Sequence, residues 1–145
     1  MKTNVYKPRV DKLFWIFAIP ITLLLISSTV LASFEPLSLI GIIPLDLFGI
    51  YFLTSSLFGY VELREETLYV KFGFFLSREI PYHTIRHIDI ESKYYTESML
   101  SIKNAVEHIN IRYNSFDCIT VSVVDNDGLV EALSSRVEVA KRLAF

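Results

Sequence analysis

Asp46 is a single carboxylate in an otherwise apolar stretch of the chain, which makes it the first candidate for a functional residue. Asp46 is the only charged residue in positions 37–61. If a membrane helix starts at Leu37, Asp46 lies among lipid chains, and a carboxylate there implies a partner or a function. The hydroxyls of residues 27–33 are then within its reach. If the helix starts near Ile43, Pro44 takes the first helical position and Asp46 the first turn, where both residue types are favoured. We favour this second arrangement, with Asp46 near water and an apolar loop before it.

The residue types that catalyse reactions or bind metals are scattered along the chain. His83 and His87 have a helical metal-ligand spacing, but they stand in strand-like sequence, where side chains four apart are separated by roughly 13 Å. We expect the histidines, His108 included, at the surface or at an edge. Cys118 is the only cysteine and has no evident base beside it, and the five glycines form no phosphate loop. We predict no enzyme, no cofactor and no metal site.

Two adjacent aromatic residues, Tyr94 and Tyr95, stand between predicted strands. Paired aromatics in a loop anchor a protein partner or enter a membrane interface. The alternative interpretation, that the two tyrosines cover the edge of the hydrophobic core, fits the sequence about as well as the anchor interpretation does. Together with Asp46, these tyrosines are the candidate interaction residues.

The elements that must position these residues begin with two apolar segments. Residues 13–34 carry no charge, and residues 37–61 carry only Asp46. Each segment, as a helix, is long enough to cross roughly 30 Å of hydrocarbon. Only Glu35 and Pro36 separate them, which predicts a two-helix membrane hairpin. A signal peptide is the alternative for the first segment, but its apolar core of about 7–15 residues is shorter.

Flanking charges predict the orientation of the hairpin. Four basic residues precede the first span, none lies between the spans, and Arg64, Lys71 and Arg78 follow the second. Because Lys and Arg accumulate on the cytoplasmic side, both termini should be cytoplasmic in a multi-pass protein of the cell membrane. The divisions are a tail (1–12), the hairpin (13–61) and a cytoplasmic domain (62–145). A single cysteine allows no internal disulfide, which suits a reducing compartment.

The cytoplasmic domain carries more acidic than basic residues. A domain that holds nucleic acid by bulk charge is basic, so we predict that this one binds none. Its apolar residues alternate in short runs, which predicts about seven antiparallel strands. After these, Asp125 can cap a helix whose apolar face is Leu129, Leu133 and Val137. We expect this helix to cover the open end of a small barrel.

Seven strands followed by one helix is the order of a pleckstrin-homology (PH) fold. The run "LSIKNAVEHINIRYNSFDCITVSVVDNDGLVEAL" (100–133) resembles the bacterial PH-like domains that are attached to short membrane hairpins, the YyaB-like group. The matching parts are Ser101, "HINIRYN", "CITVSV" and "DNDGLVEAL", and "LYVKFGFFLSREIPYHTIRHI" resembles the earlier strands. The resemblance covers roughly residues 60–143. The group commonly has Ser-Pro before the helix, where this chain has Val123-Val124, but Asp125 can still start the helix. The fold class that follows is a membrane α-helical hairpin plus an α+β PH-like domain.

The resemblance implies a fold more than a function. A related protein protects its producer from the bacteriocin sublancin, so the resemblance makes self-immunity a candidate. PH folds are best known for binding lipid headgroups through a basic loop between the first two strands. In this chain that loop is "EET" (65–67), and its acidic residues repel phosphate, which predicts no phosphoinositide-type binding.

The sequence therefore favours a non-catalytic interaction module held at the membrane. Its partner would be another membrane protein or a membrane-active peptide, and the hairpin would contact membrane lipid. The alternative is a structural or assembly protein that homo-oligomerises through its hairpin.

Overall fold

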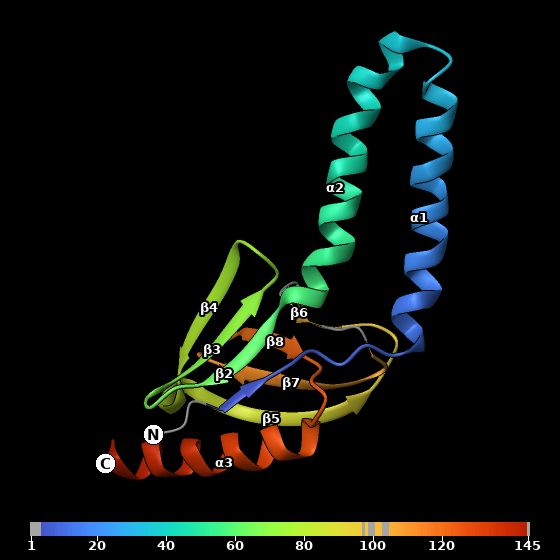
Figure 1. Ribbon diagram of the computed structural model, residues 1–145. Helices are drawn as coiled ribbons and strands as arrows, with labels where there is room; N and C mark the ends of the chain where they lie inside the picture. Colours follow the sequence, from blue (N-terminus) through green and yellow to red (C-terminus); the bar gives the residue numbers. More distant parts are fainter. Residues whose placement is uncertain (1–3, 97, 99–100, 103–104, 145) are drawn as a thin grey trace.

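The protein consists of a helical hairpin that stands on a β domain, as the computed structural model in Figure 1 shows. The structure describes residues 4–96, 98, 101–102 and 105–144. Helices α1 (Lys12–Ala32) and α2 (Leu39–Phe58) form the hairpin, and the short 3-10 helix η1 (Pro36–Ser38) lies between them. We call the described residues on either side of the hairpin, taken together, the β domain.

Both hairpin helices are long and apolar enough to cross a membrane, as the sequence predicts from length and composition. Within α1 only Ala18 and Ala32 are buried, and within α2 no described residue is. A helix that is apolar on all sides and has little protein around it is stable in a lipid environment rather than in water. By length and composition, the two helices of the hairpin could therefore span a membrane.

The predicted start of α2 near Ile43 is wrong. The helix begins at Leu39, directly after η1, and both Pro44 and Asp46 lie inside it. The position that favours proline at a helix start is taken by Pro36 of η1. Pro44 has no N–H to donate, so one carbonyl of the preceding turn has no helical partner there.

The reason for the early start is a tight connection between the helices. Ser33 ends α1, and its backbone N–H donates to the carbonyl of Thr29 at 3.1 Å. Ser38 then donates its hydroxyl to the carbonyl of Glu35 at 2.6 Å. These bonds turn the chain within a few residues, so the apolar loop that we expected before Asp46 does not form.

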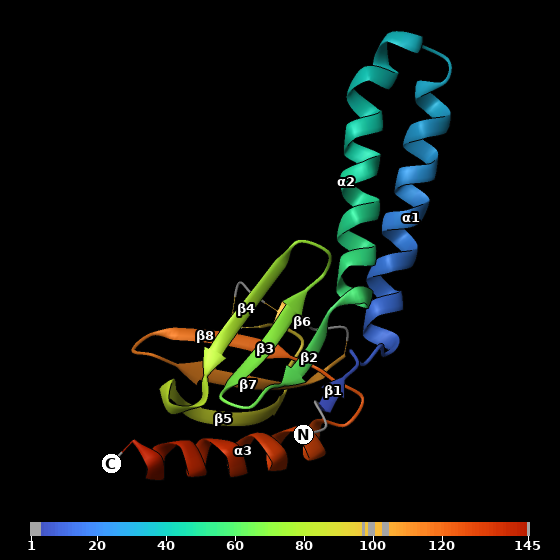
Figure 2. The same cartoon turned by 60° about the vertical axis from the view of Figure 1, so that its left-hand side comes forward.

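The strands of the β domain form two four-stranded sheets. The first sheet has the order β1 (Asn4–Tyr6), β2 (Tyr60–Leu63), β3 (Thr67–Phe72) and β4 (Leu76–Pro81), with antiparallel neighbours throughout. The second has the order β5 (Ile85–Ser92), β7 (Glu107–Tyr113), β8 (Asp117–Val121) and β6 (Ser101–Ile102). Figure 2 shows the two sheets as separate layers whose strands cross.

Two details of the predicted barrel are wrong. The sheets do not close into one barrel, because the 3-10 helix η2 (Tyr82–Thr84) carries the chain out of β4 in the first sheet and into β5 in the second. The strands are also not all antiparallel, since β6 pairs in parallel with β8. The seven strands β2–β8 and the C-terminal helix otherwise follow the predicted order.

The core lies between the two sheets and α3 (Asn126–Leu143). Leu129, Leu133 and Val137 are buried on one face of α3, which packs on η2, β5 and β7. Asp125 caps this helix as predicted, because its carboxylate accepts a hydrogen bond from the N–H of Gly128 at 2.9 Å. An apolar face of this kind contributes more to helix stability than intrinsic propensity does.

The N-terminal residues, which the sequence analysis assigns to a separate tail, belong to the β domain. β1 pairs with β2, and the N–H of Arg9 donates to the carbonyl of Ser122 at 3.0 Å. The guanidinium of Arg9 also lies 3.4 Å from the carboxylate of Glu107. Because α1 starts at Lys12, both ends of the hairpin are attached to the same domain.

Candidate binding site at the junction of the hairpin and the β domain

The junction begins where α2 runs directly into β2. Gly59 joins the two elements and is buried. A Cβ atom at this position would lie 2.7 Å from the carbonyl oxygen of Lys71 and 2.9 Å from Ile102. The absence of a side chain therefore lets the end of α2 approach β3 and β6 closely.

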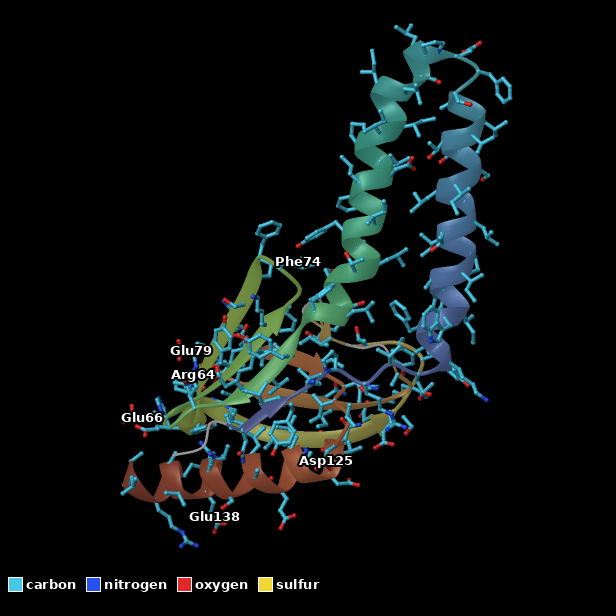
Figure 3. The ribbon with its side chains drawn as sticks, viewed as in Figure 1. Arg64, Glu66, Phe74, Glu79, Asp125 and Glu138 are labelled. Carbon is cyan, nitrogen blue, oxygen red and sulfur yellow. The ribbon has the colours of Figure 1, made fainter. Side chains whose placement is uncertain are left out.

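The turn between β3 and β4 forms the second part of the junction. Gly73 has a φ of 73°, and a Cβ there would lie 2.6 Å from the Cβ of Ser55 in α2. The next two residues place aromatic rings against the helix. The ring of Phe74 lies 4.9 Å from that of Phe58, and the ring of Phe75 lies 5.8 Å from that of Tyr51. Figure 3 shows Phe74 at the end of this turn, beside α2.

A cavity of about 650 Å³ lies among α1, α2, the β3–β4 turn and the segment after β5. Its hairpin wall includes the aromatic residues Phe14, Phe17 and Phe52 together with Ser55 of α2, whereas Thr96 and Ser98 are polar residues of the remaining wall. A largely apolar pocket of about 300–1,000 Å³ with a few polar groups is the usual form of a ligand site. This junction cavity is therefore the candidate binding site.

The two tyrosines that the sequence singles out lie at the junction but differ in position. Tyr94 lines the cavity, whereas Tyr95 does not. Their exposed fractions are 79% and 63%, so the interpretation that they cover a core edge is wrong. The ammonium of Lys93 lies 5.6 Å from the ring of Tyr95 and 2.9 Å from the carboxylate of Glu91, where its hydrogen bond lowers the pKa of Glu91.

Comparison with known protein families identifies the β domain. A family model described as a bacterial PH domain matches residues 59–137, more than half of the chain. The chain belongs to the bacterial PH domain family. The match begins at the glycine that joins α2 to β2 and ends within α3, so it covers the PH domain without the hairpin. No curated protein and no solved structure matches the chain.

The first inter-strand loop of the PH domain lies away from the hairpin. Figure 3 shows Glu66 at the end of the domain opposite the junction, with Arg64 and Glu79 beside it. Arg64 is paired with Glu62 at 3.1 Å and with Glu79 at 3.2 Å. Hydrogen bonds from Thr67 and Arg64 lower the pKa of Glu79. Arg64, the basic residue of this loop, is thus already paired with two carboxylates.

Asp46 forms a second polar site, remote from the junction cavity. Its carboxylate accepts a hydrogen bond from the hydroxyl of Thr29, and its other oxygen lies 3.4 Å from the hydroxyl of Ser28. Asp46 is half-buried between the helices. The favoured position in the first turn of α2 is therefore wrong, and the hydroxyls of α1 that the alternative arrangement offers are its partners.

The histidines, the remaining candidate metal ligands, do not form part of a metal-ligand group among the described residues. His83 and His87 are exposed as expected, but His108 is buried, with Nδ1 2.9 Å from the carbonyl of Val106. The expectation of a surface or edge position is wrong for His108, because β7 is an inner strand of the second sheet, between β5 and β8, and the residue is 1% exposed. Among the described residues, no three His, Cys, Asp or Glu side chains are grouped as metal ligands.

Sequence reasoning missed the β3–β4 turn as part of the site. Its signal was present in "FGFF" (72–75), because a glycine at a turn followed by two phenylalanines places large apolar side chains where polar residues are usual. The serines of α2 in the cavity wall gave no comparable signal, since a serine hydroxyl within an apolar helix can bond a carbonyl of its own helix, as that of Ser55 does to Phe52.

Proposed function

We propose that the chain is a multi-pass protein of the cell membrane that holds its PH domain at the cytoplasmic surface as a non-catalytic binding module. The two exposed apolar helices support the spans. The basic residues near the domain-proximal ends, such as Lys12 and Lys71, support the cytoplasmic side for the domain. The pairing of β1 with β2, which attaches the domain to both ends of the hairpin, supports a fixed position of the PH domain at the membrane surface.

The observation that carries the proposal is the junction cavity. It lies where the helices leave the apolar region and meet the PH domain, so its occupant needs an apolar part against Phe17 and Phe52 and a polar part near Thr96. An apolar segment of another membrane protein, or a membrane-active peptide, has this combination. The arrangement agrees with the enrichment of aromatic anchors at protein interfaces.

Self-immunity to a bacteriocin is the sharpest form of this proposal. A module anchored at the membrane meets a membrane-active peptide at a high local concentration, because both are held at the same bilayer. The support is the resemblance of the PH domain to a group that includes an immunity factor, together with the position of the cavity.

The alternative function is homo-oligomerisation through the hairpin, and the contacts of Asp46 help to choose between this function and the binding module. A carboxylate in a span commonly pairs with a polar group of another helix. Here Thr29 and Ser28 of the same chain already bind it, so a second subunit is not needed to satisfy the carboxylate. We therefore favour the binding module over the homo-oligomer.

The proposal includes several expected absences. The acidic loop that contains Glu66 faces away from the hairpin, which supports the view that the PH domain binds no phosphoinositide-type headgroup. The net negative charge of the chain supports the absence of nucleic acid binding. We also propose that no cofactor and no catalytic group acts in this module.

Photocrosslinking in cells tests the proposed function. A benzoylphenylalanine at Tyr94, in the cavity wall, should give a discrete adduct with a peptide or a membrane protein after irradiation. The same group at Phe116, which is 99% exposed and outside the cavity, should give several-fold less of that adduct. Because Tyr94 is largely exposed, replacing it should change stability by no more than about 0.5 kcal/mol.

The mass of the adduct separates the alternatives. An adduct of twice the mass of the chain would favour self-assembly over the binding of a different partner. Adducts with lipid alone, or equal yields at the two positions, would reject a peptide or protein as the occupant of the cavity. Tyr94→Ala should abolish the function of the protein in cells, whereas Tyr95→Ala, its matched neighbour outside the cavity wall, should not.

A further inference from the structure

The β3–β4 turn exposes a compact apolar surface at the junction. Three consecutive residues, Phe74, Phe75 and Leu76, have exposed fractions of 43%, 83% and 58%. We call these three residues the apolar tip. Large apolar side chains grouped at the end of a turn are unusual on a water-facing surface and mark a contact with a partner or a membrane.

The position of the apolar tip relative to α2 decides between these contacts. Figures 1 and 2 show the β3–β4 hairpin pointing in the same direction as the two long helices. The ring of Phe75 lies 5.8 Å from that of Tyr51, and Tyr51 is seven residues before Phe58, the last residue of α2. At 1.5 Å per residue, the tip therefore reaches roughly 10 Å along the helix from its end.

Basic residues on β3 and β4 mark where the apolar tip ends. Lys71 precedes the turn and Arg78 follows it, and Lys71 is paired in register with Ser77. Arg78 lies 3.3 Å from the hydroxyl of Tyr113, on the side of the domain rather than at the tip. An apolar end with basic residues behind it matches the order of hydrocarbon and anionic headgroups at a cytoplasmic surface.

We propose that the apolar tip is a third membrane-inserted element, placed among the acyl chains of the leaflet that surrounds the end of α2. This inference rests on the proposed function, because α2 must span the membrane for the tip to reach lipid. Phe75 and Tyr51 are side by side, so a bilayer that surrounds Tyr51 also surrounds Phe75. The occupant of this surface is therefore lipid and not a second protein.

Insertion of the tip has a consequence for the junction cavity. Gly73 and Leu76 belong to both the turn and the cavity wall. With the tip in the bilayer, this wall lies at the level of the acyl chains, and an apolar occupant enters the cavity from the membrane side. The tip also keeps the PH domain in one orientation, since it adds a third attachment beside α1 and α2.

Tryptophan quenching measures the depth of the tip directly. The chain has a single tryptophan, Trp15, near the start of α1. We would compare three full-length proteins in vesicles of phosphatidylcholine and phosphatidylglycerol whose acyl chains carry bromine: the native chain, Phe75→Trp with Trp15→Phe, and Phe116→Trp with Trp15→Phe. The Phe75→Trp protein should be quenched as strongly as the native chain and several-fold more than the Phe116→Trp protein.

The outcomes separate the inserted tip from the membrane hairpin. Quenching of Trp15 without quenching at position 75 would overturn the inserted tip and leave the spans intact. Absence of quenching at both positions would overturn the spans as well. Since only this chain is present in the vesicles, burial of position 75 in a dimer would also appear as weak quenching and would count against the inserted tip.

Discussion

Replacing Gly73 by alanine should destabilise the PH domain by about 2–5 kcal/mol. A φ of 73° costs a residue with a side chain roughly 1–2 kcal/mol. The new Cβ would also lie 2.6 Å from the Cβ of Ser55, an overlap that must move the turn away from α2 and that costs about 1–3 kcal/mol in packed sites. Urea unfolding of the full chain in detergent micelles, followed by circular dichroism, measures the loss.

The matched control is Gly41→Ala in the same protein. Gly41 lies in α2, and nothing is within 4 Å of the position that its Cβ would take. Alanine is a better helix former than glycine, by roughly 1 kcal/mol, so this variant should be at least as stable as the native chain. Equal stability of the Gly73→Ala and Gly41→Ala proteins would mean that the turn does not contact α2 as described.

Asp46→Leu should improve membrane insertion of isolated α2 by up to about 3–4 kcal/mol. This is the approximate difference between aspartate and leucine at the centre of a spanning helix. In the complete hairpin the gain should be smaller, because the substitution also removes the hydrogen bond from Thr29, and such interhelical bonds contribute roughly 0.6–1.7 kcal/mol. A glycosylation-based insertion assay on α2 alone and on the hairpin measures both values.

Two variants that each remove one hydroxyl group show why Asp46→Leu should improve insertion less in the hairpin than in isolated α2. Thr29→Val removes the nearer of the two hydroxyls that contact Asp46 and should bring the gain in the hairpin close to that in isolated α2. Ser27→Ala is the control, since the hydroxyl of Ser27 bonds the carbonyl of Leu24 in its own helix. The pairing of Asp46 with α1 is rejected if Asp46→Leu gives the same gain in both contexts before any hydroxyl is changed.

The start of α2 illustrates what local sequence signals leave undecided. Pro44 and Asp46 are both residue types that are favoured at a helix start, and the residues near them gave no reason to prefer a different starting position for α2. The turn at Ser38 and the hydroxyl of Thr29 decide the outcome, and Thr29 is 17 residues from Asp46 in the chain. Contacts at that separation depend on how the two helices pack, which a single-residue preference does not encode.

The regular elements were predictable because their signals are periodic. Leu129, Leu133 and Val137 define the buried face of α3, and Asp125 marks its start. The pairing of strands was not predictable in the same way. β1 joins Asn4 to Leu63, and β6 joins Ser101 to Thr120 in parallel, although both are too short to show clear alternation. Register between such distant segments depends on the assembled core rather than on either segment.

The candidate site was predictable only in part for the same reason. Tyr94 stands out in the sequence as an aromatic residue in a loop, and it does line the cavity. The cavity itself needs four separate segments to meet, and the close approach at Gly59 and Gly73 brings two of them together. Glycine at these positions is informative only once the neighbouring backbone is known.

The central claim is that the hairpin crosses the membrane and holds the PH domain on the cytoplasmic side. Single cysteines placed at Glu35 and Phe116 in a Cys118→Ser background test it most directly. Glu35 lies in the turn between the helices, and Phe116 lies in the β7–β8 turn and is 99% exposed. In intact cells a membrane-impermeant maleimide should label position 35 and should label position 116 only after the membrane is opened. Labelling of position 116 in intact cells, or protection of position 35, would contradict the account.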